Sequence, residues 1–135
     1  FSTILDCGKA AAAAQPEADV LIGMSLGVMP AQCLAQTRPG VRAAVLLHGA
    51  VPVSEFSPHW PKAVAVQIHA MDADPEFVDS GDIDAARALV AEADDGDLFL
   101  YPGDGHLFTD DSLGDYDAAA AALLRERLVE FLARL

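Results

Sequence analysis

The sequence has 135 residues, of which 53% are hydrophobic, and this length suits a single domain over residues 1–135 with a core of its own. A formal net charge of −13 argues against nucleic acid and anionic membrane surfaces as partners. No basic-then-apolar signal segment opens the chain, and no apolar run is long enough to span a bilayer. We therefore expect a soluble cytoplasmic protein without a membrane partner.

Apolar runs without polar alternation predict strands, and they alternate with segments that predict helices. Helices are expected over residues 1–15, from after Ser25 to about Thr37, over Asp82–Ala93, and from Asp115 or Asp117 to the end. Strands are expected at Val20–Met24, Val41–His48, Ala63–His69 and Leu98–Tyr101, with loops over 49–62, 71–81 and 102–114. This alternation is typical of an α/β fold with a parallel sheet of about four strands, covered by helices on both faces.

Two helices carry further expectations. The two cysteines, Cys7 and Cys33, do not make a disulfide framework, and Cys33 is expected to be a buried free thiol in the helix after Ser25. The last helix is expected to turn its large apolar residues inward at helical spacing. These residues are Leu123, Leu124, Leu128, Phe131, Leu132 and Leu135.

The first strand leads into a Gly-x-Ser-x-Gly motif, Gly23-Met24-Ser25-Leu26-Gly27. In a sharp strand-to-helix turn the serine is strained, and the residues two before and two after it must be small. The hydroxyl of Ser25 then projects above the strand end, and the N–H of Leu26 lies at a helix N-terminus that stabilises negative charge. The motif predicts Ser25 as a nucleophile and Leu26 as an oxyanion donor, although a glycine-rich connection with an idle serine has the same pattern.

Acids and histidines follow the other predicted strands. His48 ends the second, Asp72 and Asp74 follow the third, and His106 follows the fourth in Gly103-Asp104-Gly105-His106. Because functional groups gather at the carboxyl ends of parallel strands, these side chains are expected to converge on one rim. Serine needs a base at neutral pH, and the order Ser, Asp, His is that of α/β-hydrolases. We predict that His106 is this base, in a loop made mobile by glycines, and that Asp74 or Asp72 orients it.

A metal site is a chemically possible alternative use of this rim. His48, His69, Asp72 and His106 could supply ligands, although no tight ligand spacing such as HxH or HExxH is present. His48 and His69 are more simply interpreted as core or rim histidines bonded to the backbone. We therefore expect neither a metal nor another cofactor.

The residues from Gly23 to Leu135 resemble the dienelactone hydrolase family of α/β-hydrolases. The matching pieces are Gly-Met-Ser-Leu-Gly at the elbow, Val-Gln-Ile-His-Ala-Met-Asp-Ala-Asp-Pro after the third strand, and Tyr-Pro-Gly-Asp-Gly-His-Leu-Phe after the fourth. The resemblance implies Ser25 as nucleophile, Asp74, the acid before Pro75, as orienting acid, and His106 as base. It implies a serine hydrolase that forms an acyl-enzyme from small carboxylic esters or lactones.

The chain departs from the family pattern in four places. Well-known members carry cysteine where this chain has Ser25, a second glycine where it has Val28, and a glycine where it has Met71; the first difference favours serine-esterase chemistry. Full-length members also have several strands before the elbow strand, and these normally supply the second oxyanion N–H. The resemblance therefore implies the C-terminal part of an α/β-hydrolase fold, with Val20–Met24 at the sheet edge.

An exposed apolar edge strand invites pairing with another chain. We therefore expect that two copies form a homodimer by pairing through Val20–Met24 or by swapping segments to complete the sheet. The same departure leaves a second interpretation open, in which the chain is a catalytically weak or inactive hydrolase scaffold that acts as an assembly or binding module.

Overall fold

The computed structural model describes residues 2–135; Phe1, which the sequence places in the first helix, lies outside the described residues. The strands are β1 (Val20–Met24), β2 (Ala43–Leu47), β3 (Ala65–Met71) and β4 (Gly96–Tyr101). The α-helices are α1 (Ser2–Ala13), α2 (Val28–Thr37), α3 (Pro75–Val78), α4 (Asp82–Glu92) and α5 (Ala118–Ala133), and the 3-10 helices are η1 (Ser25–Gly27) and η2 (Val53–Glu55).

The strands form one parallel sheet in the order β1-β2-β3-β4, which confirms the predicted α/β class. Because all neighbouring strands are parallel, the C-terminal ends of the four strands lie along the same side of the sheet. Leu47 of β2 is in register with Met24 of β1, and Met71 of β3 with Tyr101 of β4. The segments that follow these four residues therefore start side by side on one rim.

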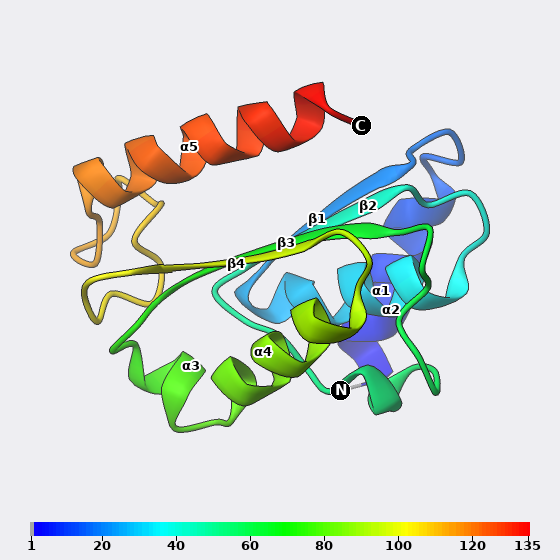
Figure 1. Ribbon diagram of the computed structural model, residues 1–135, viewed down its shortest axis with the longest axis horizontal. Coiled ribbons are helices and arrows are strands. Elements are labelled where there is room, and N and C mark those ends of the chain that lie inside the picture. The colour runs from blue at the N-terminus through cyan, green and yellow to red at the C-terminus, as the bar shows by residue number, and fades with distance from the viewer. Residues whose placement is uncertain (1) are drawn as a thin grey trace.

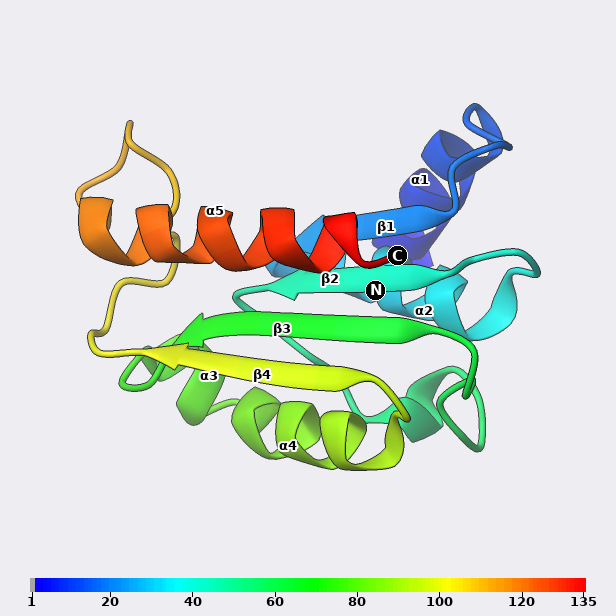
Figure 2. The ribbon, with the colours of Figure 1, turned by 45° about the horizontal axis from the view of Figure 1, so that its top comes forward.

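Helices cover both faces of the sheet, as predicted (Figure 1). The helices α2 and α4 lie on one face, and α1 packs against α2. The helix α5 lies on the other face, as Figure 2 shows from a turned view. Each face has its own apolar core, one around Leu46, Ile68 and Phe77, the other around Phe108 and Phe131. Strand β2 is buried along its whole length because it lies inside the sheet and between both cores.

The structure corrects or narrows several of the predicted segments. Residues 71–81, expected to be a loop, contain α3, because Asp74 caps a turn that begins with Pro75. Strand β4 begins at Gly96 instead of Leu98, since Gly96 pairs with Val66. The last helix is capped by Asp117, which accepts a hydrogen bond from the N–H of Ala120.

The apolar side chains of the helices follow the expectation with two exceptions. Cys33 is a buried free thiol, as predicted. On α5, Leu124 and Phe131 are buried, and Leu128 and Leu135 pack against the same core. Leu123 and Leu132, predicted to face inward, are exposed, because the buried stripe of this helix is narrower than the apolar pattern. Over residues 2–135, no helix has the length and apolarity needed to cross a membrane.

Candidate active site

The turn at Ser25 has the geometry expected of a nucleophile elbow. Ser25 follows β1 directly and begins η1, which leads into α2. Its φ is 50°, a left-handed conformation that costs a residue other than glycine about 1–3 kcal/mol. A Cβ at Gly23 would lie 2.4 Å from the carbonyl oxygen of Gly27 and 2.8 Å from the Cβ of Ala31, so Gly23 has to be glycine. The prediction that Gly27 must be small for the same reason is wrong, because a Cβ there would meet nothing within 4 Å.

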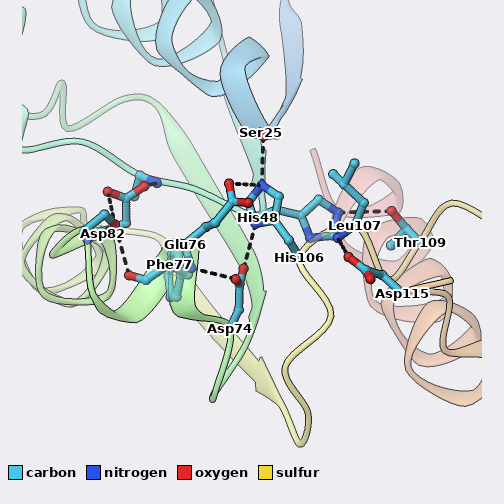
Figure 3. A network of polar contacts seen from close by, with 12 residues as sticks. Ser25, His48, Asp74, Glu76, Phe77, Asp82, His106, Leu107, Thr109 and Asp115 are labelled. Carbon is cyan, nitrogen blue, oxygen red and sulfur yellow. Dashed lines mark hydrogen bonds and ion pairs between the residues drawn. The ribbon is translucent and has the colours of Figure 1, made fainter. Parts of the chain in front are cut away.

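His106 lies within hydrogen-bonding distance of two other predicted site residues, Ser25 and Asp74 (Figure 3). The Oγ of Ser25 is 2.9 Å from the Nε2 of His106, although the two residues are 81 positions apart. The Nδ1 of His106 is 2.7 Å from the Oδ2 of Asp74. The ring of His106 thus bridges a hydroxyl and a carboxylate.

The hydrogen-bond partners of His106 define its neutral tautomer. An ionised carboxylate only accepts, so the proton of the neutral ring lies on Nδ1 and is donated to Asp74. The Nε2 atom is then an acceptor that faces the hydroxyl of Ser25. This is the protonation state in which a histidine can take a proton from serine.

Asp74, rather than Asp72, lies against the histidine. Asp74 is fully buried and caps α3, where its Oδ1 accepts a hydrogen bond from the N–H of Glu76. That bond leaves Oδ2 directed at His106. The carboxylate of Asp72 is instead exposed and accepts a hydrogen bond from the N–H of Gly103.

The glycines beside His106 allow close packing of its loop. Gly103 has a φ of 142°, and a Cβ there would lie 2.7 Å from the sulfur of Met71. A Cβ at Gly105 would lie 2.6 Å from the carbonyl oxygen of Asp115. These contacts explain on steric grounds why both positions are occupied by glycine. The mobility of the loop stays a prediction.

His48 holds the far end of the same loop. Its Nε2 is 3.0 Å from the Oγ1 of Thr109, and its ring meets the ring of Phe108 edge-on with centroids 4.9 Å apart. Burial lowers the pKa of His48 to about 4; the neighbouring His106 acts in the same direction and Asp74 opposes it. His48 is therefore a neutral wall residue at pH 7. The expectation of a backbone partner for its ring is wrong, since the partner is a side chain.

His48 also has two unusual features. Its φ is 65°, so it shares the left-handed conformation of Ser25 at the neighbouring strand end. Its Nδ1 is buried without a hydrogen-bond partner, the single such side-chain atom found in residues 2–135. Both features carry an energetic cost in the wall of the site.

His69 lies away from the rim. It is fully buried, with Nδ1 2.8 Å from the hydroxyl of Tyr101 and Nε2 2.8 Å from the Oε1 of Gln67. Burial lowers its pKa to about 3, with the charge of Arg127 as the next cause. Its partners are again side chains instead of the predicted backbone groups.

The residues of the alternative metal site do not gather around one point. His69 is held by Tyr101 and Gln67, Asp72 by the backbone of Gly103, and His106 by Asp74. In the part of the chain that the structure describes, no group of three or more Cys, His, Asp or Glu is placed to hold a metal ion. The geometry thus gives no support to the metal-dependent alternative.

A cavity of about 220 Å³ opens at the Ser25 hydroxyl. Ser25, Leu26 and Met29 line it from the elbow, and His48 and residues 49–51 line it from the end of β2. Its polar wall consists of Glu76, Asp82 and His106. A small substrate placed there would contact the serine and the histidine together.

A comparison with known protein families matches residues 5–135 to the family described as the dienelactone hydrolase family. The chain belongs to the dienelactone hydrolase family. The matched residues include Ser25, Asp74 and His106, and the resemblance inferred from the sequence motifs is thereby confirmed.

The fold agrees with a solved member of this family. The chain is similar to a crystal structure of a protein assigned as a dienelactone hydrolase from Klebsiella pneumoniae subsp. pneumoniae MGH 78578, with a TM-score of 0.68 and 21% sequence identity. The alignment covers 86% of this chain and 52% of that one, so this chain spans about half the length of that relative. The likeness establishes a shared α/β-hydrolase-like fold. A search of curated proteins found no match.

Sequence reasoning missed several residues of this site, among them Glu76 and Thr109. The Oε2 of Glu76 is 3.4 Å from the Nε2 of His106. A signal for it exists, because Asp74 followed by Pro75 is a helix start and places Glu76 in the first turn beside the capping acid. The bond between His48 and Thr109 has no local signal, since it joins residues 61 positions apart.

Proposed function

We propose that this chain is a serine hydrolase that acts on small carboxylic esters or lactones through an acyl-enzyme. One observation carries the proposal: Ser25, His106 and Asp74 form a continuous hydrogen-bonded line, with Oγ–Nε2 and Nδ1–Oδ2 distances of 2.9 and 2.7 Å. A hydroxyl, an imidazole and a buried carboxylate in this order are the components of a nucleophilic triad.

In the first step, the Oγ of Ser25 attacks the carbonyl carbon of the substrate and its proton moves to the Nε2 of His106. The imidazolium that forms lies against the carboxylate of Asp74, which is buried and therefore little screened by water. The carbonyl oxygen becomes an oxyanion. We assign the backbone N–H of Leu26 as a donor to it, because this group lies in the first turn leading to α2.

The tetrahedral intermediate then collapses to products. The bond to the leaving alcohol breaks, His106 returns the proton to that alcohol, and the acyl group stays on Ser25. In the second half, His106 takes a proton from water, the hydroxide attacks the acyl-enzyme, and the acid leaves as Oγ regains its proton. With a lactone the alcohol and the acid are parts of one product.

Covalent labelling tests this proposal. Diisopropyl fluorophosphate should add one diisopropylphosphoryl group to the intact protein, and peptide mapping should locate it on Ser25. Ser25→Ala should abolish both the labelling and the hydrolysis of p-nitrophenyl acetate. Ser54→Ala, which alters an exposed serine of η2 outside the cavity, is the matched control and should retain both. A folded wild-type protein that is neither labelled nor active would refute the proposal.

A second candidate function is an assembly or binding role of the same scaffold. It is favoured by the open edge of β1, where Ile22 and Met24 are 53% and 46% exposed, and by Leu26 just after it, which is 65% exposed. An unpaired apolar strand edge tends to pair with another strand, and we propose a second copy of this chain as the partner. This role predicts folded protein without an ester burst, whereas the hydrolase predicts a burst.

A further inference from the structure

A carboxylate faces the same nitrogen atom that faces Ser25. The Oε2 of Glu76 lies 3.4 Å from the Nε2 of His106, and the Oγ of Ser25 lies 2.9 Å from it. Figure 3 shows the side chain of Glu76 directed at His106 beside the serine. In the neutral ring, Nε2 carries no proton, so Glu76 makes no hydrogen bond there. Its carboxylate therefore adds a negative charge to the wall of the cavity beside Ser25.

A second carboxylate belongs to the same cavity wall. Asp82 lines the cavity, and its Oδ2 accepts a hydrogen bond from the N–H of Ala50, 3.2 Å away. Its Oδ1 accepts from the hydroxyl of Ser80 at 2.9 Å. These neutral donors orient the carboxylate without cancelling its charge. The cavity is thus bordered by two acids, Glu76 and Asp82.

Neither lysine nor arginine is found among the described residues that line this cavity. The two segments that follow β3 and β4 repeat this imbalance, since residues 71–82 and 102–117 each contain five acidic residues and neither lysine nor arginine. The arginines that pair with acids do not line the cavity: Arg42 pairs with Asp19, Arg87 with Asp84, and Arg134 with Asp95 and Asp97. Asp19, Arg42, Asp95 and Asp97 lie at the N-terminal ends of β1, β2 and β4, away from the strand ends that carry the site.

We infer that this site selects uncharged or cationic esters and rejects substrates whose acyl part carries a carboxylate. The inference rests on the proposed hydrolase function and names its substrate class. An anionic acyl group in the cavity would meet Glu76 and Asp82 with no cation to offset them, and like charges in a half-buried cleft repel more strongly than in bulk water. Glu76 is itself largely exposed, so salt screens part of the repulsion and the expected discrimination is about tenfold.

The test uses p-nitrophenyl esters of similar acyl length and different charge: p-nitrophenyl butyrate, the p-nitrophenyl monoester of succinate, and p-nitrophenyl 4-(trimethylammonio)butyrate. For each ester, kcat/KM is divided by its rate of hydrolysis by hydroxide, which removes differences in intrinsic reactivity. We expect the anionic ester to fall about tenfold below the neutral one, and the cationic ester to equal or exceed it. Adding potassium chloride should narrow the gap. An anionic ester used as well as the neutral one would overturn the inference.

Variants assign the effect to the cavity. In Glu76→Gln the anionic-to-neutral ratio should rise at least about threefold, and Asp82→Asn should change it in the same direction. Glu130→Gln removes the same charge from the exposed face of α5 and should leave the ratio as in the wild type. A ratio that is equal in all four proteins would contradict the inference, because overall charge and not the cavity would then set the selectivity.

A binding measurement separates this inference from the proposed function. Ser25→Ala protein is titrated with methyl butyrate, the monomethyl ester of succinate, and the methyl ester of 4-(trimethylammonio)butyrate, and chemical shifts of the His106 ring are followed by NMR. Weaker binding of the succinate ester supports the inference even if the wild type hydrolyses nothing, in which case only the hydrolase proposal fails. Hydrolysis that prefers the anionic ester refutes the inference alone.

Discussion

The ring of His48 and the hydroxyl of Thr109 are hydrogen-bonded at 3.0 Å, and this contact ties the end of β2 to the loop that carries His106. Thr109 lies three residues after His106, and Phe108, which lies between them, is fully buried. The bond therefore limits how far the ring of His106 can move from Ser25.

Removing this hydroxyl should loosen the histidine loop. Thr109→Val keeps the shape of the side chain but removes the partner of His48, so we expect a loss of about 1–3 kcal/mol of unfolding free energy in urea titrations. Hydrolysis of p-nitrophenyl butyrate should fall because His106 is held less firmly. Thr109→Ser keeps the hydroxyl and should retain the stability and the hydrolysis rate of the wild type. Equal stability of all three proteins would contradict the structural role of the bond.

The two carboxylates after β3 should differ sharply in importance. Asp74→Asn leaves the ring of His106 without its charged partner, and kcat should fall on the order of 10⁴-fold, as expected when a triad acid is replaced by its amide. Asp72→Asn alters an exposed side chain bonded to the backbone of Gly103, and kcat should stay within about twofold of the wild type. Steady-state kinetics compares the two; a larger loss in Asp72→Asn would exchange their roles.

The two glycines of the elbow should also differ in how well they tolerate substitution by alanine. Gly23→Ala would force a Cβ to within 2.4 Å of the carbonyl oxygen of Gly27, so we expect a loss of about 1–3 kcal/mol of stability and loss of activity. Gly27→Ala places its Cβ in open space with a φ of −69°, which alanine adopts readily. Thermal unfolding and ester hydrolysis should therefore find Gly27→Ala near the wild type, contrary to the motif rule.

Stability should fall on mild acidification. The folded state holds the pKa of His48 at about 4 and that of His69 at about 3, whereas both are about 6.5 when unfolded. Below pH 6.5 the unfolded chain binds protons that the folded chain does not, so folding weakens as pH falls. For each histidine, the free energy of unfolding should fall by about 2 kcal/mol as the pH is lowered from 6.5 to 5.

Urea unfolding at several pH values measures this effect. His48→Asn, which keeps a polar residue that tolerates a left-handed backbone, should make the slope between pH 6.5 and 5 shallower than in the wild type. An unchanged slope in His48→Asn would show that the burial of this histidine does not carry the effect. A wild-type stability that is flat over this range would argue against buried neutral histidines.

The open edge of β1 should control self-association. Ile22→Lys places a charge on an exposed apolar strand residue and should shift a dimer toward monomer in sedimentation velocity experiments. Val129→Lys makes the same change at an exposed position of α5 and should not. A wild-type protein that is monomeric at all concentrations would rule out the proposed pairing with a second copy.

Local signals in the sequence determined the order and type of most elements. Unbroken apolar runs such as Ala43–Leu47 predict buried parallel strands, and parallel strands that follow one another end on a common rim. That geometry alone was enough to bring Ser25, His106 and the acids after β3 into one neighbourhood. Asp74 and Pro75 also indicate the start of α3, although the loop pattern of residues 71–81 as a whole predicts no helix there.

Only the tertiary structure decided which side chains meet. Asp74 and Asp72 point in different directions because one caps α3 and the other bonds to Gly103, and this depends on how two distant loops pack. The approach of Glu76 to His106 and the tolerance at Gly27 likewise depend on contacts across the fold. Periodicity along a chain encodes which residues are buried, whereas distances between loops follow from packing that no single segment contains.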